Sequence, residues 1–140
     1  MTDSVGMATE YVRSPRLFPS APDAHAAISP ESGLVVTAGA CPLDYQGHVV
    51  APGDIATQTR QAVDNLRIAL EDSGAKMADV LKTTIFVSSS SRDDLLVAWH
   101  EVAAAFGEHK PPSTLLGVAV LGYADQLVEI EAVAVAPPRS

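Results

Sequence analysis

The sequence has little cysteine, and this scarcity excludes several kinds of site. Its one cysteine, Cys41, can form neither an intramolecular disulfide nor a metal site built from several cysteines. The histidines do not indicate a metal site either. No two of His25, His48, His100 and His109 have the sequence spacing of paired metal ligands. Phosphate-binding loops of the G-x-x-x-x-G-K-[ST] and G-x-G-x-x-G types are also missing. The sequence therefore predicts no metal site and no nucleotide site.

Basic residues are scarce as well. There are 9 Lys and Arg against 17 Asp and Glu, so the formal net charge is -8. The basic residues are scattered, and the densest pairing is Arg13 with Arg16. Phosphate backbones are bound by clustered Lys and Arg, so we expect no nucleic-acid partner.

Long apolar runs are absent, and aromatic residues make up only 5 % of the chain. The uncharged stretch 113–124 is far shorter than the ~20 apolar residues that span a membrane. The first residues show no basic stretch followed by an apolar one, so no secretory signal is predicted. Hydrophobic residues nevertheless make up 47 % of the chain. We expect a cytoplasmic protein with no membrane contact and one sizeable core.

Prolines and glycines divide the chain into elements. Residues 1–20 are weakly patterned and proline-rich, so we expect a flexible N-terminal segment before a single domain at 21–138. Two short strands are predicted at 25–29 and 34–39, around the turn PESG. β-branched or alternating residues predict further strands at 79–89, 114–121 and 127–135.

Two helices are predicted between these strands. The first begins after Asp54, which can cap it, and ends at Gly74. The second follows Ser91 and ends at Gly107, before the extended KPPS. Its predicted buried stripe consists of Leu95, Leu96, Trp99, Val102, Ala103 and Phe106. The strand at 79–89 is expected to place Leu81, Thr83, Ile85 and Val87 on one side.

This order of elements predicts an α+β fold, a mixed β-sheet with two helices packed on one face. The closing strand alternates, with Val128, Ile130, Ala132 and Ala134 on one face and Leu127, Glu129, Glu131, Val133 and Val135 on the other. The second face is too apolar for water, and another subunit is its simplest cover.

Glu129 and Glu131 lie about 7 Å apart on that second face. A carboxylate on an apolar face is costly unless it is paired, hydrogen-bonded or solvated in a cleft. A cleft of this kind suits a carboxylate to proton transfer. The alternative is an exposed strand end, where a glutamate needs no function.

His25 and Cys41 are the other residues whose positions suggest a site. His25 lies in a short strand beside the first turn and is the most plausible site histidine, although a lone histidine is often structural. Cys41 follows Gly39 and Ala40, whose small size would let backbone amides approach a ligand. No base or helix N-terminus is placed beside Cys41, which favours a small buried hydrophobe over a nucleophile.

Several segments together resemble the YjgF/RidA family of reactive intermediate deaminases. They are LVVTAGACPLD, GDIATQTRQAVDNLRIALEDSGAKMADVLKTTIFV, VAAAFGEHKPPST and the closing VEIEAVAV, within residues 24–136. The resemblance implies a chorismate-mutase-like fold, assembled as a homotrimer with three ligand clefts between subunits. It also implies hydrolysis of short-lived enamines and imines, such as 2-aminoacrylate, to a 2-oxo acid and ammonia, with no cofactor.

The same resemblance assigns residues to the cleft. Glu129 matches a glutamate that faces the cleft and positions the attacking water. The backbone of Ala38, Gly39, Ala40 and Cys41 matches the strand end that lines the cleft. His25 aligns with a tyrosine of the first strand, Trp99 stands near the place of a family asparagine, and Leu115 completes the predicted substrate-binding set.

One departure concerns an arginine that clamps the substrate carboxylate through two parallel hydrogen bonds, in a P-x-R-[ST] setting. Here the segment is PPSTLLGV, and the position aligns with Ser113, whose hydroxyl cannot replace a bidentate cation. We therefore expect a more neutral cleft and a substrate that lacks the simple α-carboxylate.

Three functions are open at this point. The first is an enzyme that hydrolyses a C=N bond, in which Glu129 activates water and Ser113 or His25 supplies polar contacts. The second is a trimer that binds a small metabolite without turnover. The third, an endoribonuclease or translation inhibitor as in some relatives, is least compatible with the charge of -8.

Overall fold

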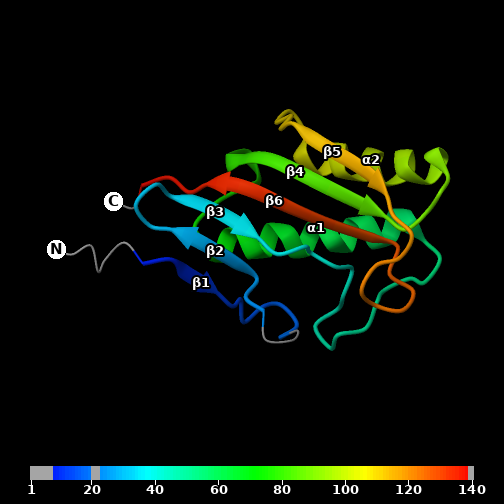
Figure 1. Ribbon diagram of the computed structural model, residues 1–140, viewed down its shortest axis with the longest axis horizontal. Coiled ribbons are helices and arrows are strands. Elements are labelled where there is room, and N and C mark those ends of the chain that lie inside the picture. The colour runs from blue at the N-terminus through cyan, green and yellow to red at the C-terminus, as the bar shows by residue number, and fades with distance from the viewer. Residues whose placement is uncertain (1–7, 20–22, 139–140) are drawn as a thin grey trace.

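The computed structural model describes residues 8–19 and 23–138 (Figure 1). Its elements follow in the order β1 (Glu10–Val12), β2 (Ala26–Ser29), β3 (Leu34–Thr37), α1 (Ile55–Asp72), the 3-10 turn η2 (Met77–Asp79), β4 (Val80–Val87), α2 (Arg92–Phe106), β5 (Ser113–Gly117) and β6 (Val128–Val135). The strands form one sheet in the order β1-β2-β3-β6-β4-β5. β4 and β5 are parallel, with α2 as the crossover between them, and the other neighbouring strands are antiparallel.

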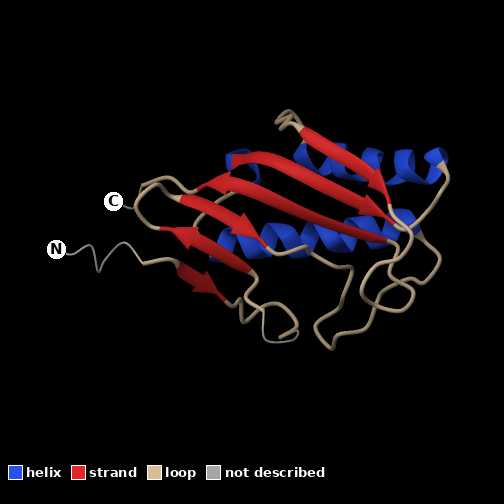
Figure 2. Cartoon of the chain, viewed as in Figure 1, coloured by secondary structure: helices blue, strands red, loops and turns tan. Residues whose placement is uncertain are grey.

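Both helices lie on one face of the sheet, behind the strands in the view of Figure 2. The predicted α+β fold, a mixed sheet with two helices, is thereby confirmed. At the start of α1 the Asp54 carboxylate accepts a hydrogen bond from the backbone N–H of Thr57, and beyond its end Gly74 adopts a φ of 86°. Neither helix, in the part of the chain that the structure describes, is long and apolar enough to cross a membrane.

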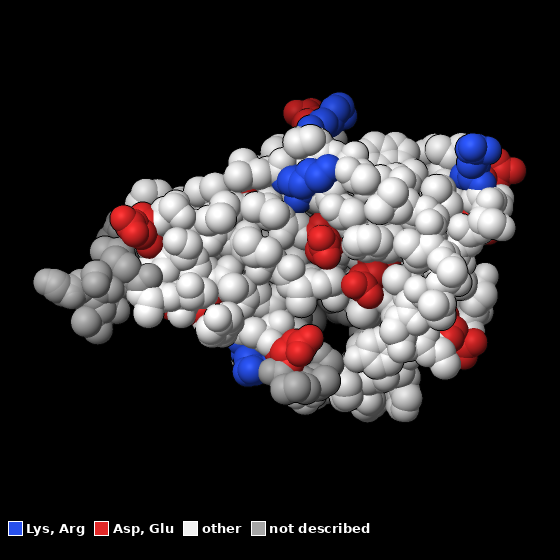
Figure 3. Space-filling model, viewed as in Figure 1, with Lys and Arg blue, Asp and Glu red and all other residues white. Residues whose placement is uncertain are grey.

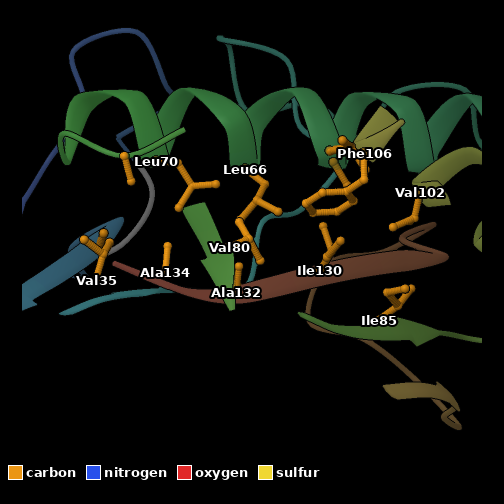
Figure 4. Close-up of a cluster of buried hydrophobic side chains, with 14 of the residues drawn as sticks. Val35, Leu66, Leu70, Val80, Ile85, Val102, Phe106, Ile130, Ala132 and Ala134 are labelled. Atoms are coloured by element: carbon orange, nitrogen blue, oxygen red, sulfur yellow. The ribbon is translucent and has the colours of Figure 1, made fainter. Parts of the chain in front are cut away.

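The core lies between the helices and the helix-facing side of β6. Val128, Ile130, Ala132 and Ala134 are buried, whereas the residues between them are partly exposed, so the predicted alternation is confirmed. Leu66 and Leu70 of α1 and Phe106 of α2 pack onto this strand (Figure 4). This burial fixes which face of β6 is covered, because a slip of one residue would expose every buried side chain.

A β-bulge changes the face of one predicted core residue. The register of β4 against β6 shifts between Val80 and Lys82, so Leu81 is an extra residue there. Residues beyond the bulge are buried as predicted (Thr83, Ile85 and Val87). The prediction for Leu81 is wrong, because it is 50 % exposed. Across a bulge, the alternation of buried and exposed residues shifts by one residue.

α2 buries a narrower stripe than predicted. Its buried residues are Ala98, Val102 and Phe106, and Leu95 and Trp99 pack partly against the core. The assignment of Leu96 to the stripe is wrong, because its side chain is 48 % exposed. Ala98 was missed because a single methyl group contributes little to a hydrophobic pattern.

β1 lies in the N-terminal segment where no regular element was predicted, so that part of the prediction is wrong. Glu10 to Val12 pair with Ile28 to Ala26 of β2. A three-residue edge strand with two exposed side chains leaves almost no pattern in the sequence. The predicted flexibility of residues 1–7 and 20 falls outside the described residues. β5 also ends earlier than predicted, at Gly117.

The face of the sheet that the helices leave open carries few charges (Figure 3). Apolar residues on this face include Val36, Leu116 and Val135, which are 46 %, 43 % and 38 % exposed. On β6 the same face carries Glu129, opposite Phe86, and Glu131, opposite Thr84. Two carboxylates therefore lie on a largely apolar surface, as the alternation predicted.

Candidate functional site

A small cavity of about 70 Å³ lies beside the end of β3, where the chain leaves the sheet. Five of the residues predicted for the cleft line it: His25, Ala38, Gly39, Ala40 and Cys41. The rest of the lining comes from Leu17 and Phe18 before β2, Leu43 after β3, Asn65 and Ala69 on α1, and Tyr123 before β6. The fold thus brings all four residues of the predicted backbone wall to one place.

The chain after β3 stays beside β6 and carries this wall. Ala40 and Ile130 exchange both backbone hydrogen bonds, at 2.7 and 3.1 Å. Gly39 consequently lies against the Glu129 side chain, where an added β-carbon would stand 1.9 Å from Oε2 of Glu129. Only a residue without a side chain leaves room for the carboxylate in this position.

Glu129 holds its two carboxylate oxygens in different surroundings. Oε1 accepts a hydrogen bond from the side-chain amide of Gln126 at 3.1 Å and another from the Cys41 thiol at 3.4 Å. Oε2 lies beside Gly39. Glu131 lies farther along β6, opposite Thr84, so Glu129 is the glutamate that contacts the wall of the cavity.

Cys41 is a protonated thiol in this setting. Burial raises the pKa of the thiol to about 12, and the negative charge of Glu129 and its hydrogen bond add to the effect. A thiol that keeps its proton is a hydrogen-bond donor and a poor nucleophile, as the sequence indicated. Cys41 is nevertheless half-buried and hydrogen-bonded, rather than a fully buried hydrophobe.

Tyr123 contributes a neutral phenol to the cavity. Burial raises the pKa of this group, and the nearby negative charges of Asp23 and Glu129 raise it further. No pattern in the sequence marks Tyr123, because it lies in the connection between two predicted strands.

Two polar residues of α1 hold the loops that form the cavity. The side-chain amide of Asn65 donates to the backbone carbonyl of Cys41 at 2.9 Å. Gln58 is fully buried, donates to the carbonyl of Asp125 at 2.9 Å and accepts a hydrogen bond from the Leu127 N–H at 2.8 Å. Both residues belong to the segment QTRQAVDNL. Apolar periodicity does not indicate their burial, because their side chains are polar.

Gln126 is a further buried residue that the sequence analysis missed. It is 3 % exposed, and its Oε1 accepts a hydrogen bond from the backbone N–H of Tyr123 at 3.1 Å. Its Nε2 donates to the carbonyl of Val128 at 3.1 Å as well as to Glu129. The amide therefore connects the loop before β6 to the carboxylate.

His25 lines the cavity, but both of its ring nitrogens are already engaged. The backbone N–H of Ser14 donates to Nδ1 at 3.0 Å, which assigns the ring proton to Nε2. Nε2 then donates to the carbonyl of Phe18 at 3.2 Å. The prediction that His25 supplies a polar contact to substrate is not supported by this geometry, since its hydrogen bonds hold the segment 14–18 in place.

Ser113, Leu115 and Trp99 lie on the helix-facing side of β5, away from Glu129 within the chain. The Ser113 hydroxyl accepts a hydrogen bond from Thr83 at 2.6 Å and donates to the carbonyl of Pro111 at 3.1 Å. Ser113 and Trp99 line a groove of about 320 Å³ between α2 and β5. Leu115 pairs with the buried Ile85 and packs against the core. The chain does not by itself bring these three predicted residues to the cavity.

Thr114 is the residue of this segment that faces the open side of the sheet. It pairs with Thr84, which in turn pairs with Glu131. Its hydroxyl accepts a hydrogen bond from the Lys82 ammonium group. Strand alternation therefore points Thr114, rather than Ser113, to the same face as Glu129.

The cavity lining contains no Lys or Arg. Several described arginines are paired elsewhere, Arg16 with Glu71 and Asp72, Arg60 with Glu101, and Arg67 with Asp64 and Glu71. The described residues also contain no group of three or more His, Cys, Asp or Glu that could hold a metal ion. The cavity lining therefore offers no Lys or Arg to an anion, and the Glu129 carboxylate lies beside it against Gly39.

Comparison with known proteins identifies the family. A family model described as endoribonuclease L-PSP matches residues 17–136. The 2-iminobutanoate/2-iminopropanoate deaminase of Escherichia coli (strain K12) is 36 % identical over 105 residues, covering 73 % of this chain and 79 % of that protein. The chain belongs to the YjgF/RidA family.

Solved structures related to the YjgF/RidA family share the fold. A member of the YjgF/YER057c/UK114 family from Mycobacterium tuberculosis is 35 % identical, with a TM-score of 0.73 over 92 % of this chain and 100 % of that one. The TdcF protein of E. coli, solved with bound serine, is 25 % identical, with a TM-score of 0.79 over 91 % of this chain and 99 % of that one. The family resemblance of the sequence is confirmed.

Proposed function

We propose that this protein hydrolyses an enamine or imine intermediate to a carbonyl compound and ammonia, with Glu129 as the proton-transferring group. The observation that carries the proposal is the Glu129 carboxylate, held against Gly39 beside the cavity. The deaminase activity of the E. coli relative, at 36 % identity, supports the reaction class.

The proposed reaction needs one group that can take up and return a proton. Water attacks the imine carbon, and Glu129 accepts the proton that the water loses as the new C–O bond forms. The nitrogen takes up the electron pair of the C=N bond and receives that proton from Glu129, which gives a neutral carbinolamine. Glu129 then accepts the hydroxyl proton as the C=O bond forms and returns it to the nitrogen as the C–N bond breaks, so that ammonia leaves. The sum is one imine and one water converted to one carbonyl and one ammonia.

We propose that the cleft is completed by a second subunit of a homotrimer. The open sheet face supports this assembly, because Val36, Leu116 and Val135 expose apolar surface there. Ser113, Leu115 and Trp99 lie at the opposite edge of the sheet from β1 and β2. Their side chains face the helices, so an assembly across the open face would instead bring Thr114 of this segment towards a Glu129 cleft.

The proposed substrate lacks a simple α-carboxylate. Support comes from the cavity, whose lining carries no cation that could hold a carboxylate in two hydrogen bonds. Glu129 itself would repel an anion. Along the PPSTLLGV segment Ser113 is committed to Thr83 and Pro111, and Thr114 faces the open side with a hydroxyl rather than a guanidinium.

A second candidate function is the binding of a small metabolite without turnover. The TdcF protein, which shares the fold and was solved with bound serine, favours this alternative. We do not extend the proposal to ribonuclease activity, although the family description names it. A net charge of -8 opposes the binding of phosphate backbones.

The test is product release from two substrates generated in situ, 2-aminoacrylate and an imine without a carboxylate. We expect acceleration over spontaneous hydrolysis for the neutral imine, weaker acceleration for 2-aminoacrylate, and loss of both in Glu129→Ala. Equal efficiency on both substrates would contradict the substrate class. No acceleration of either, together with binding of the imine or its product, would favour the metabolite-binding alternative.

A further inference from the structure

The two oxygens of the Glu129 carboxylate differ in their hydrogen-bond partners. Oε1 accepts from Gln126 Nε2 at 3.1 Å and from Cys41 Sγ at 3.4 Å. Oε2 accepts a hydrogen bond from no donor within residues 8–19 and 23–138, and it lies over the bare α-carbon of Gly39. One oxygen is therefore committed to the protein and the other is left for a ligand.

The orientation of the Gln126 amide follows from its surroundings. The backbone N–H of Tyr123 donates to Oε1 of Gln126 at 3.1 Å, and the Val128 carbonyl accepts from Nε2 at 3.1 Å. A flipped amide would place NH₂ against N–H and oxygen against both a carbonyl and a carboxylate. Gln126 must therefore present its NH₂ group to Glu129. A buried amide with all these contacts has little freedom to turn away.

The Cys41 thiol approaches the same oxygen from another side. Its sulfur is 3.4 Å from Oε1 of Glu129 and 3.7 Å from the carbonyl oxygen of Gly39. The carboxylate is charged and nearer, so it is the stronger acceptor. Because burial and Glu129 raise the pKa of the thiol to about 12, the proton needed for this donation is present at neutral pH.

We propose that Gln126 and Cys41 are positioning residues that bind Oε1 of Glu129, so that Oε2 alone exchanges protons with water and substrate. This inference rests on the proposed function, since it assigns a direction to the same carboxylate. Two donors on one oxygen prevent rotation of the carboxylate, and Gly39 lets Oε2 occupy the space beside the backbone. The reacting lone pair is then presented in one orientation beside Gly39.

Kinetics of Gln126→Met and of Cys41→Ala test the positioning role. Each variant keeps an uncharged side chain but removes one donor to Oε1. We expect kcat to fall about tenfold in Gln126→Met and about threefold in Cys41→Ala, with KM changed less than about twofold, because only orientation in the reacting complex is lost. Cys41→Ser, which restores a donor, should recover most of the rate lost in Cys41→Ala. The matched control is Gln46→Met, an exposed glutamine on the 42–53 loop.

A second measurement does not depend on catalysis. The chain has a single cysteine, so the rate of iodoacetamide alkylation at pH 9 reports the thiolate of Cys41 alone. Glu129→Gln should speed alkylation about threefold to tenfold, because a neutral amide removes the charge that holds the proton on sulfur. Gln126→Met should slow it, since the Gln126 hydrogen bond acts in the opposite direction.

The outcomes separate this inference from the proposed function. If Glu129→Gln keeps full activity, both the proposed function and the positioning roles are overturned. If Glu129→Gln is inactive but Gln126→Met and Cys41→Ala retain wild-type kcat, the positioning roles alone are overturned. Unchanged alkylation of Cys41 in Glu129→Gln would also overturn the contact, even if Gln126→Met proved too unstable to assay.

Discussion

The polar groups of two regions, one around Gly39 and Glu129 and one around Ser113, differ in how many of their hydrogen-bonding positions are occupied. Ser113 accepts from Thr83 and donates to Pro111, so its proton and one lone pair are engaged on the helix-facing side of the sheet. Glu129 has one oxygen engaged, and the other lies beside Gly39 with no donor among the described residues. A group can act on a ligand only if it keeps free hydrogen-bonding capacity. Of these two groups, Glu129 keeps the larger capacity.

The difference also shows which predicted residues belong together. Gly39, Ala40 and Cys41 share a cavity beside Glu129, whereas Trp99 and Ser113 share a groove between α2 and β5. The chain therefore does not place all of them in one cleft. The comparison can therefore be tested by changing each region separately.

Gly39→Ala should have the largest effect. A β-carbon at this position would stand 1.9 Å from Oε2 of Glu129, so the carboxylate must leave its place. We expect activity to fall at least about 100-fold, as it does when a reacting group is misplaced by an ångström. The measurement is kcat/KM on the neutral imine.

The control for that variant is Gly122→Ala. An added β-carbon at residue 122 meets nothing within 4 Å, and this glycine lies in the same loop as Tyr123. It should leave activity and thermal unfolding unchanged. Equal loss in both variants, or near-normal activity in Gly39→Ala, would contradict the close contact of Gly39 with Glu129.

A pair of arginine substitutions compares the two faces of β5. Thr114→Arg adds a cation on the open face and should lower KM for 2-aminoacrylate about tenfold, since a guanidinium can hold its carboxylate. Ser113→Arg places the same cation against Thr83 and the groove of Trp99, so it should instead lower stability by about 2 kcal/mol. A KM gain from Ser113→Arg alone would show that residue 113 faces the cleft.

Gln58→Leu should destabilise the fold and, through it, the site. The variant leaves the buried carbonyl of Asp125 and the N–H of Leu127 without their partner. We expect the free energy of unfolding to fall by about 2 to 4 kcal/mol in urea denaturation. Gln46→Leu, at an exposed position, should change it by less than about 0.5 kcal/mol. Similar small effects in both would argue against a role for Gln58 in holding the loop.

The smallest predicted effect concerns stability in alkali. The folded chain holds the Cys41 proton up to about pH 12, whereas an unfolded chain releases it near its ordinary pKa of 9.0. Above pH 9 the unfolded state therefore binds fewer protons, and the free energy of unfolding falls as pH rises towards 12. Between pH 8 and pH 10.5, wild type should lose about 2 kcal/mol more than Cys41→Ala. A parallel decline of both proteins would contradict the protonated thiol.

Local patterns predicted the elements that carry the site. The alternation of β6 placed Glu129 on the open face, and small residues after β3 predicted a backbone wall. The bulge at Leu81 and the burial of Gln126 could not be read from the sequence, because both depend on contacts with distant strands and loops. The resemblance aligns the family arginine with Ser113, and such an alignment does not determine which face of β5 a residue occupies.

The most direct test of the central assignment compares Glu129→Gln with Glu131→Gln. Both glutamates lie on the same face of β6, but only Glu129 contacts Gly39, Cys41 and Gln126. The measurement is carbonyl release from the neutral imine, relative to spontaneous hydrolysis. We predict that acceleration disappears in Glu129→Gln and persists in Glu131→Gln. Acceleration that survives in Glu129→Gln, or that disappears only in Glu131→Gln, would contradict the assignment of Glu129 as the reacting carboxylate.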